Sequence, residues 1–446
     1  MQVNFGLDSG DYSKGKQTFV TWDSKKVINA HMLVVGKTGT GKTHTLRKII
    51  QEMIDSRKGG QKFRVRIIDV HGDIEVPNCS TVKFSETSDY GFNPLAVNPD
   101  PEYGGVRRRI QSFISILNKT SRKLGTKQEP ALRNILKDLY AANGFYENDP
   151  KSWSIVDLHG RPLMHNGKQK KYPTLEDAYR YANFKHNAMY LGSNNRTTLL
   201  LEKVNKLARK MNASQKKGYK ALTADDLAEQ KEQIKLIGEE AVQSFSEHIT
   251  SIETGREFSD LLKYDSIETM KSIVNRLESL LASGIFKNRI PEFDPNSTVW
   301  RYNIKPISDY DEKKMFVYFL LEEIYLKCFQ EGEQDDVVEM VFLDEANLFF
   351  SDEADNIINI ISKEARKFGM GLCCASQSPT HFSEDFMSSV GTKVILGIDQ
   401  LFWNGSVQKL KIDQKALEWI VPQKKLVIQI NNKGELRNNF SWVLIK

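Results

Sequence analysis

A chain of 446 residues, 40% of them apolar, is long enough for two or three domains with ordinary buried cores. Its formal charge of +6 is small for this length, and it lacks the roughly 20 consecutive apolar residues that a membrane span requires. Its four cysteines show no C-x-x-C spacing, which argues against a disulfide framework or a structural zinc site. We therefore expect a globular, soluble, cytoplasmic protein with no membrane insertion of its own.

The first part of the chain has the pattern of a parallel α/β unit. Residues 1–30 alternate enough to predict short strands, and residues 31–36 (HMLVVG) predict a buried strand that a glycine ends. A helix is expected to follow and to run to about residue 55. Residues 63–73 (FRVRIIDVHGD) predict the next strand, ending at Asp69. Strand, helix and strand in this order form a βαβ unit.

The segment between the first strand and its helix fits the phosphate-binding pattern G-x-x-x-x-G-K-[ST]. Its glycines let backbone N–H groups surround a β-phosphate at the positive end of a helix. Lys42 would bridge the β- and γ-phosphates, and the Thr43 hydroxyl would bind magnesium. The sequence therefore predicts a nucleoside triphosphate site with Mg²⁺. Its nucleotide-contacting residues are Gly36, Lys37, Thr38, Gly39, Thr40, Gly41, Lys42, Thr43 and His44.

The end of the second strand has two interpretations. Asp69, His71 or Asp73 would contact the nucleotide or its water network, or the segment is a turn that aspartate and glycine cap. The sequence gives no reason to treat His71 as a metal ligand.

The middle of the chain, from about residue 106 to 287, is dominated by helical patterns and predicts an α-helical insertion. Nine basic residues and one acidic residue lie between Gly105 and Lys137, and nine basic and four acidic residues lie between Lys203 and Lys235. Such clusters can neutralise nucleic-acid phosphates, although a solvated helix face explains them equally well.

Alternating strands and helices return after the helical middle. Strands are predicted at residues 297–304, 337–345, 371–377, 392–398, 425–430 and 441–446, with helices at 313–329 and 357–369. The sequence therefore predicts one core sheet built from both ends of the chain.

An acidic pair follows one of these buried strands. The run of residues 337–343, apolar except for Glu339, brings Asp344 and Glu345 to the carboxyl end of a strand, where doubly wound sheets bind their ligands. Asp344 would hold the magnesium shell. Glu345 would orient the attacking water and deprotonate it.

Two further polar residues flank the strand at residues 371–377. Gln377 would place an uncharged amide beside the γ-phosphate, or it is an ordinary polar residue at a strand end. Arg366, which precedes this strand, would reach the γ-phosphate of a neighbouring subunit as an arginine finger. The alternative is that Arg366 and Lys367 form a basic pair that stabilises a helix C-terminus.

These motifs, in this order, resemble the HerA/FtsK superfamily of P-loop ATPases, and in particular HerA and the conjugative TraC-like ATPases. The residues that carry the resemblance are HMLVVGKTGTGKT, IIDVHGD, GFNPLAV, VFLDEANLFF and EARKFGMGLCCASQSP. The resemblance covers residues 30–105 and 265–446, and barely covers the helical middle.

The resemblance implies an α/β fold: a RecA-like P-loop core with a mainly parallel sheet and an inserted α-helical subdomain. Residues 1–105 and 288–446 would form this core, and residues 106–287 the insertion. It also implies a hexameric ring that binds ATP and Mg²⁺ between subunits and translocates double-stranded DNA. Lys42, Glu345, Gln377 and Arg366, the last acting in trans, would be the catalytic residues, and Thr43 and Asp344 the metal ligands. Two alternatives remain: a conjugation or secretion ATPase acting on protein or nucleoprotein, and an ATPase subunit that partners a nuclease in a defence system.

Overall fold

The computed structural model describes residues 1–191, 263–435 and 439–445, together with residues 235, 236, 238, 239, 242, 243 and 246. It contains two compact units. The first unit combines residues 1–92 with 283–446, and the second comprises residues 93–282.

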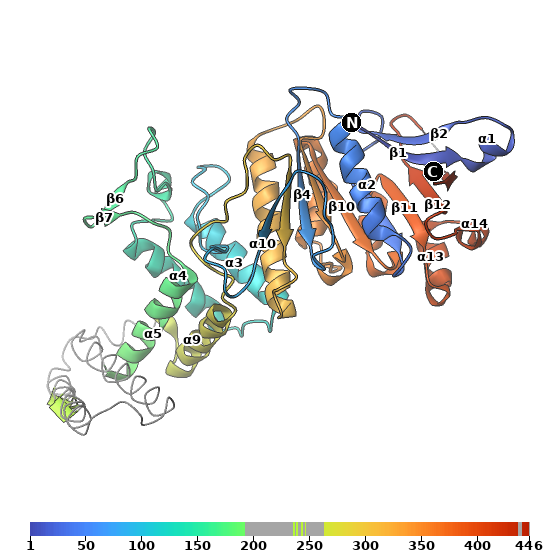
Figure 1. Ribbon diagram of the computed structural model, residues 1–446. Coiled ribbons are helices and arrows are strands. Elements are labelled where there is room, and N and C mark those ends of the chain that lie inside the picture. Colours follow the sequence, from blue (N-terminus) through green and yellow to red (C-terminus); the bar gives the residue numbers. More distant parts are fainter. Residues whose placement is uncertain are drawn as a thin grey trace, which may run out of the picture. The chain divides into compact units, whose positions relative to one another are not determined.

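The first unit is built on an 11-stranded sheet (Figure 1). Its strands, from one edge to the other, are β2 (Phe19–Asp23), β1 (Gln2–Asp8), β13 (Phe440–Leu444), β12 (Lys425–Ile430), β11 (Thr392–Gly397), β3 (Met32–Gly36), β10 (Met370–Ser376), β9 (Glu339–Leu343), β4 (Arg64–Asp69), β8 (Val299–Asn303) and β5 (Cys79–Lys83). The strands from β11 to β5 pair in parallel, and those from β2 to β12 join them as antiparallel neighbours. The predicted α/β class with a mainly parallel sheet is therefore confirmed.

The central strands are buried on both faces, as their continuous apolar sequences indicate. Every residue of β3, β9 and β10 is buried. Met32 and Val34 of β3 contribute to the core cluster that contains the apolar side chains of α2. Because β10 pairs with both β3 and β9, the segments that follow these three strands emerge at one edge of the sheet.

Helices complete the first unit. They are α1 (Ser9–Ser13), α2 (Lys42–Asp55), α10 (Tyr310–Gln330), α11 (Ile357–Glu364), α12 (Glu384–Ser389), α13 (Trp403–Leu410) and α14 (Gln414–Trp419), with 3-10 turns η2 (Ala346–Leu348), η3 (Ala365–Phe368), η4 (Pro379–His381) and η5 (Gln400–Phe402). The predicted helix at residues 357–369 ends early as an α-helix, because its last turn tightens into η3 before Gly369 adopts a left-handed conformation.

Strand β5 was not predicted. Only Val82 of its five residues is buried, so the segment lacks the apolar alternation that identifies a strand. Its pairing with β8 places it at the edge of the sheet.

The described part of the second unit is mainly helical. Its elements are α3 (Val106–Thr120), α4 (Gln128–Ala142), the 3-10 turn η1 (Pro150–Trp153), a short hairpin of β6 (Met164–His165) and β7 (Lys168–Gln169), α5 (Leu175–Leu191) and α9 (Ile267–Ala282). Helix α4 packs against α3, α5 and α9. Residues 192–234 of the predicted helical insertion lie outside the described residues, and with them all of the basic residues between Lys203 and Lys235 except Lys235 itself.

Part of the basic cluster at residues 105–137 forms ion pairs within this unit. Lys127 pairs with Asp265, Arg133 with Glu129, and Lys137 with Glu147. Arg107 and Arg108 are exposed in the first turn of α3, where a positive charge opposes the helix dipole. Among the described residues, no helix combines the length and the apolar composition needed to cross a membrane.

Candidate nucleotide-binding site

The glycine-rich loop connects the buried strand β3 to the first turn of α2, as predicted. Gly39 and Gly41 have positive φ angles of 84° and 93°, which L-residues with a side chain rarely adopt. Gly41 is the N-cap of α2, and no side chain caps this turn. The N–H groups that open α2 are therefore suited to bind phosphate oxygens.

The loop is closed by its own hydrogen bonds. Thr40 Oγ1 donates to the carbonyl oxygen of Lys37 at 2.7 Å, and Lys42 Nζ donates to the carbonyl oxygen of Gly36 at 2.7 Å. A Cβ atom at Gly36 would lie 2.3 Å from Thr40 Oγ1, so this position also requires glycine. Lys42 thus holds its ammonium group inside the loop, where it can contact phosphate.

The remaining predicted nucleotide contacts lie on the same loop and on the first turn of α2. Lys37, Thr38, Gly39 and His44 are exposed, whereas Gly41 and Thr43 are half-buried. A glycine-rich loop with exposed residues at the positive end of a helix has the chemistry of a triphosphate cradle.

Asp344 and Glu345 directly follow β9, two strands away from β3. Asp344 is 5% exposed, and burial, followed by the neighbouring charge of Glu345, raises its pKa to about 6. Glu345 is 7% exposed and has a left-handed backbone, with φ of 46°. Strained backbone of this kind costs on the order of 1–3 kcal/mol and is concentrated at functional sites.

Several side chains converge on one carboxylate oxygen of Glu345. Gln377 Nε2 donates to Oε1 at 3.4 Å, Lys42 Nζ lies 3.9 Å from Oε1, and His71 Nε2 lies 3.6 Å from it. Strand β10, which carries Gln377 at its end, lies between β3 and β9. The structure therefore brings together Lys42, Glu345 and Gln377.

Arg366 lies at the other end of β10. It belongs to η3, before the strand begins, and lines a cavity of about 770 Å³ together with Lys363 and Lys367. The seven residues of β10 span ~20 Å, so the structure does not bring Arg366 to the phosphate loop of its own chain. Burial and the nearby Arg366 charge lower the pKa of His31 to about 4.

The turn after β4 has the aspartate cap and the glycine that one of the two alternatives from the sequence predicted. Asp69 is fully buried and caps the turn, accepting hydrogen bonds from the N–H groups of Gly72 and Ile74 at 2.7 and 3.0 Å. Asp73 faces the site, where its Oδ2 accepts a hydrogen bond from Thr43 Oγ1 at 3.2 Å. The contacts of His71 and Asp73 were not assigned from the sequence, and the D-x-H-G-D spacing after a strand was the available signal.

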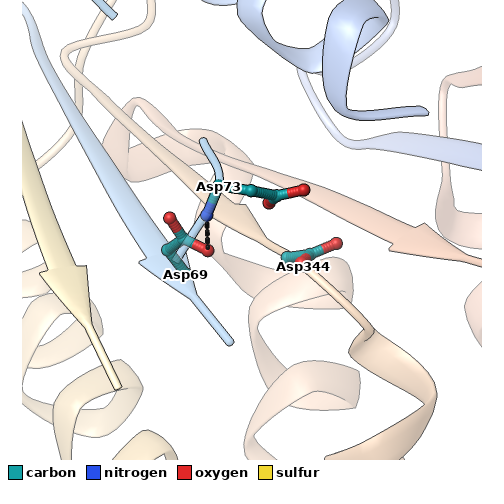
Figure 2. A group of neighbouring side chains, drawn as sticks. All are labelled: Asp69, Asp73 and Asp344. Carbon is teal, nitrogen blue, oxygen red and sulfur yellow. Dashed lines mark hydrogen bonds between the residues drawn. The ribbon is translucent and has the colours of Figure 1, made fainter. Parts of the chain in front are cut away.

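Carboxylate and hydroxyl oxygens gather beside the phosphate loop. Asp69, Asp73 and Asp344 each place a carboxylate oxygen within 4.8 Å of the others (Figure 2). The Asp69 carboxylate already accepts hydrogen bonds from N–H groups of the turn and from Arg301 Nε, the latter at 2.8 Å. Asp73 accepts a hydrogen bond from Thr43, which leaves Thr43 and Asp344 as oxygen ligands of the type that Mg²⁺ prefers, so the residues present fit the predicted cation.

Comparison with protein families gives a match over most of the chain. The family described as the central domain of the helicase HerA matches residues 8–324. A probable helicase of Methanocaldococcus jannaschii is 22% identical over 410 residues, which cover 89% of this chain and 62% of the relative. The DNA double-strand break repair helicase HerA of Pyrococcus furiosus is 26% identical over 183 residues, which cover 32% of each chain. The chain therefore spans less than two thirds of the length of either relative.

Solved structures show the same fold. The structure of VirB4 of Thermoanaerobacter pseudethanolicus matches with a TM-score of 0.62 at 13% identity, covering 100% of this chain and 96% of that one. The bacterial conjugative coupling protein TrwBΔN70 matches with a TM-score of 0.51 at 10% identity, covering 100% of this chain and 94% of that one. At these identities the likeness concerns the fold alone.

Proposed function

Because the chain belongs to the family of the HerA helicase central domain, we propose that it is an ATP-hydrolysing motor that translocates double-stranded DNA as a hexameric ring. One observation carries the proposal. Lys42 of the phosphate loop, Glu345 after β9 and Gln377 after β10 meet at a single carboxylate oxygen. A base, a phosphate-binding cation and an uncharged amide are the groups that NTP hydrolysis requires.

The chemistry follows from the placement of these groups. Lys42 binds the β- and γ-phosphates, Glu345 orients and deprotonates the attacking water, and Gln377 contacts the γ-phosphate or that water. Thr43 and Asp344 would hold Mg²⁺, which would neutralise charge on the phosphate oxygens. The exposed N–H groups at the start of α2 bind the phosphates without adding charge.

The position of Arg366 supports assembly into a ring. An arginine at the amino end of β10 is too distant to act on the nucleotide of its own chain. It becomes a catalytic residue when it reaches the γ-phosphate held by a neighbouring subunit, where such a residue increases the rate by about 10³- to 10⁵-fold. The ring and its subunit number belong to the proposal.

DNA as the cargo is supported by two observations. The relative in Pyrococcus furiosus is described as a DNA double-strand break repair helicase. Arg107 and Arg108 are exposed at the start of α3, where their charge is unfavourable for the helix itself. Exposed arginines that do not stabilise their own helix are suited to phosphate contacts.

The test is ATP turnover by the purified, assembled protein with and without long double-stranded DNA. We expect strong stimulation by DNA, lost in Glu345→Gln, and a lower stimulation in Arg107→Ala/Arg108→Ala. Turnover that ignores DNA in a preparation shown by native mass spectrometry to be oligomeric would contradict DNA translocation. That result would favour the conjugation or secretion alternative, in which the cargo is protein or nucleoprotein, or the alternative of an ATPase subunit that partners a nuclease.

A further inference from the structure

The turn after β4, residues 69–74, contacts the proposed hydrolytic site through two side chains that the proposed mechanism does not use. His71 faces Glu345, and Asp73 faces Thr43. Asp73 and Asp344 come from different strand ends and lie beside each other (Figure 2). We call residues 69–74 the β4 turn.

The β4 turn is held in place by groups outside the site. The buried Asp69 accepts hydrogen bonds from three N–H groups of the turn, that of Asp73 among them (Figure 2), and from Arg301 Nε at 2.8 Å on the neighbouring strand β8. Gly72 has φ of 74°, and a Cβ there would lie 3.1 Å from Lys305 Cδ, so glycine allows the close approach. Asp69 and Gly72 thus maintain the conformation of the turn. The side chains of His71 and Asp73 are therefore available for contacts with the site.

His71 acts on the orientation of Glu345. Its Nε2 lies 3.6 Å from Oε1, the same oxygen that Gln377 and Lys42 approach. Gln377 donates a hydrogen bond to Oε1, and the nitrogen atoms of Lys42 and His71 lie 3.9 and 3.6 Å from it. All three side chains therefore lie on the Oε1 side of the carboxylate, which leaves Oε2 as the oxygen that accepts the proton of the attacking water. Removing one of them allows the Glu345 side chain to rotate and misplaces the proton acceptor.

Asp73 acts on the orientation of Thr43. A threonine hydroxyl has one proton and two lone pairs. Since Thr43 Oγ1 donates that proton to Asp73 Oδ2 at 3.2 Å, its lone pairs are directed away from Asp73 and are available to a cation. Arg47 donates to the backbone carbonyl oxygen of Asp73, which fixes this residue to the second turn of α2.

We propose that the β4 turn is the positioning element of the hydrolytic site, with His71 orienting Glu345 and Asp73 orienting Thr43. The inference rests on the proposed ATP hydrolysis. It assigns different tasks to the two side chains: His71 affects the chemical step through the base, and Asp73 affects cation binding through the hydroxyl. Partners of ligating groups at this distance typically change affinity or activity by about 10- to 100-fold.

The experiment measures two quantities in the full-length protein: steady-state kcat and KM for ATP, and the binding of a fluorescent ATP analogue as a function of Mg²⁺ concentration. For His71→Ala we expect kcat to fall by about 10- to 100-fold with KM and nucleotide binding unchanged, and His71→Gln, which keeps an N–H donor, to recover part of kcat. For Asp73→Ala we expect the Mg²⁺ concentration required for nucleotide binding to rise about tenfold or more, with Asp73→Asn, which keeps an acceptor oxygen, in between.

His159→Ala and Asp89→Ala are the matched controls, since both side chains are exposed and lie outside the site; they should behave as wild type. Unchanged kcat in His71→Ala, or equal losses in kcat and in nucleotide binding, would overturn the role of His71. An unchanged Mg²⁺ requirement in Asp73→Ala would overturn the role of Asp73. If either alanine variant fails to fold by circular dichroism, the His71→Gln and Asp73→Asn variants decide.

Failure of the proposed function is distinguishable from failure of this inference. A wild-type protein with no turnover above Glu345→Gln contradicts ATP hydrolysis, and with it the role of His71. The Mg²⁺ dependence of nucleotide binding still tests Asp73 in that case.

Discussion

The charge of Asp344 is unfavourable for the folded protein in the absence of a cation. Burial and the neighbouring Glu345 raise its pKa to about 6, so folding favours the protonated form. The contribution of the Asp344 carboxyl to the free energy of unfolding is therefore fully present below the pKa of an unfolded aspartate. This contribution is lost as pH rises through about 6. The difference from an ordinary aspartate corresponds to roughly 3 kcal/mol.

We accordingly expect Asp344→Asn to raise the melting temperature of the nucleotide-free protein at pH 8, measured in EDTA. The advantage over wild type should shrink as pH falls toward 4, because the wild-type carboxyl becomes neutral there. Mg²⁺ should raise the melting temperature of wild type and leave Asp344→Asn unchanged. A variant that is less stable than wild type at pH 8 would show that the carboxylate is stabilised in the fold.

At the scale of residues, the sequence predicted the positions of those side chains that a local sequence pattern alone determines. The phosphate loop and the acidic pair each follow one buried strand, and both lie where they were expected. The contacts of the β4 turn were not predictable in this way. They depend on Arg301, more than 200 positions away, which pairs with Asp69 and fixes how the turn is directed.

At the scale of elements, the buried pair of Asp69 and Arg301 connects β4 to β8. Asp69 is 0% and Arg301 4% exposed. Removing one partner of a buried pair leaves an uncompensated charge, which typically costs about 3–5 kcal/mol.

We expect Arg301→Met to lower the free energy of unfolding by about 3–5 kcal/mol in urea denaturation. The matched control is Arg161→Met, because Arg161 also pairs with an aspartate but its side chain is 74% exposed. Exposed pairs contribute about 0–1 kcal/mol. Equal losses in the two variants would show that burial does not determine the contribution of the Asp69–Arg301 pair.

Three of the predicted strands show their burial directly in their composition. β3, β9 and β10 are entirely buried, and apart from Glu339 at the start of β9 they consist of apolar or small residues. β5 has one buried residue, and its pairing with β8 depends on a partner more than 200 positions later in the chain. An edge strand of this kind is defined by long-range pairing, which periodicity does not report.

At the scale of the whole molecule, the sheet is assembled from both ends of the chain, as the order of the strand patterns predicted. β3 and β4 come from the first 70 residues, and β9, β10 and β11 come from residues 339–397. The chain leaves and re-enters this unit at adjacent points, because Phe92 N–H donates to the carbonyl oxygen of Ile285 at 3.1 Å and Gly91 N–H to that of Arg289 at 2.8 Å. Residues 93–282 are therefore inserted at one place in the nucleotide-binding unit.

This connection predicts that the insertion can be removed. Residues 1–92 joined to 283–446 by a linker of about four residues, the length of a β-turn, should fold and bind nucleotide with a Kd within about threefold of the full chain. Lys42, Thr43, Asp344 and Glu345 all belong to this unit, so its phosphate and cation contacts are retained.

Stimulation of ATP turnover by DNA should be lost in the shortened protein if the arginines of α3 contact the duplex. Circular dichroism and titration with a fluorescent nucleotide check the prediction, and the same deletion carrying Lys42→Ala shows whether binding occurs at the phosphate loop. A shortened protein that is folded but does not bind nucleotide would show that the helical unit contributes to the site itself.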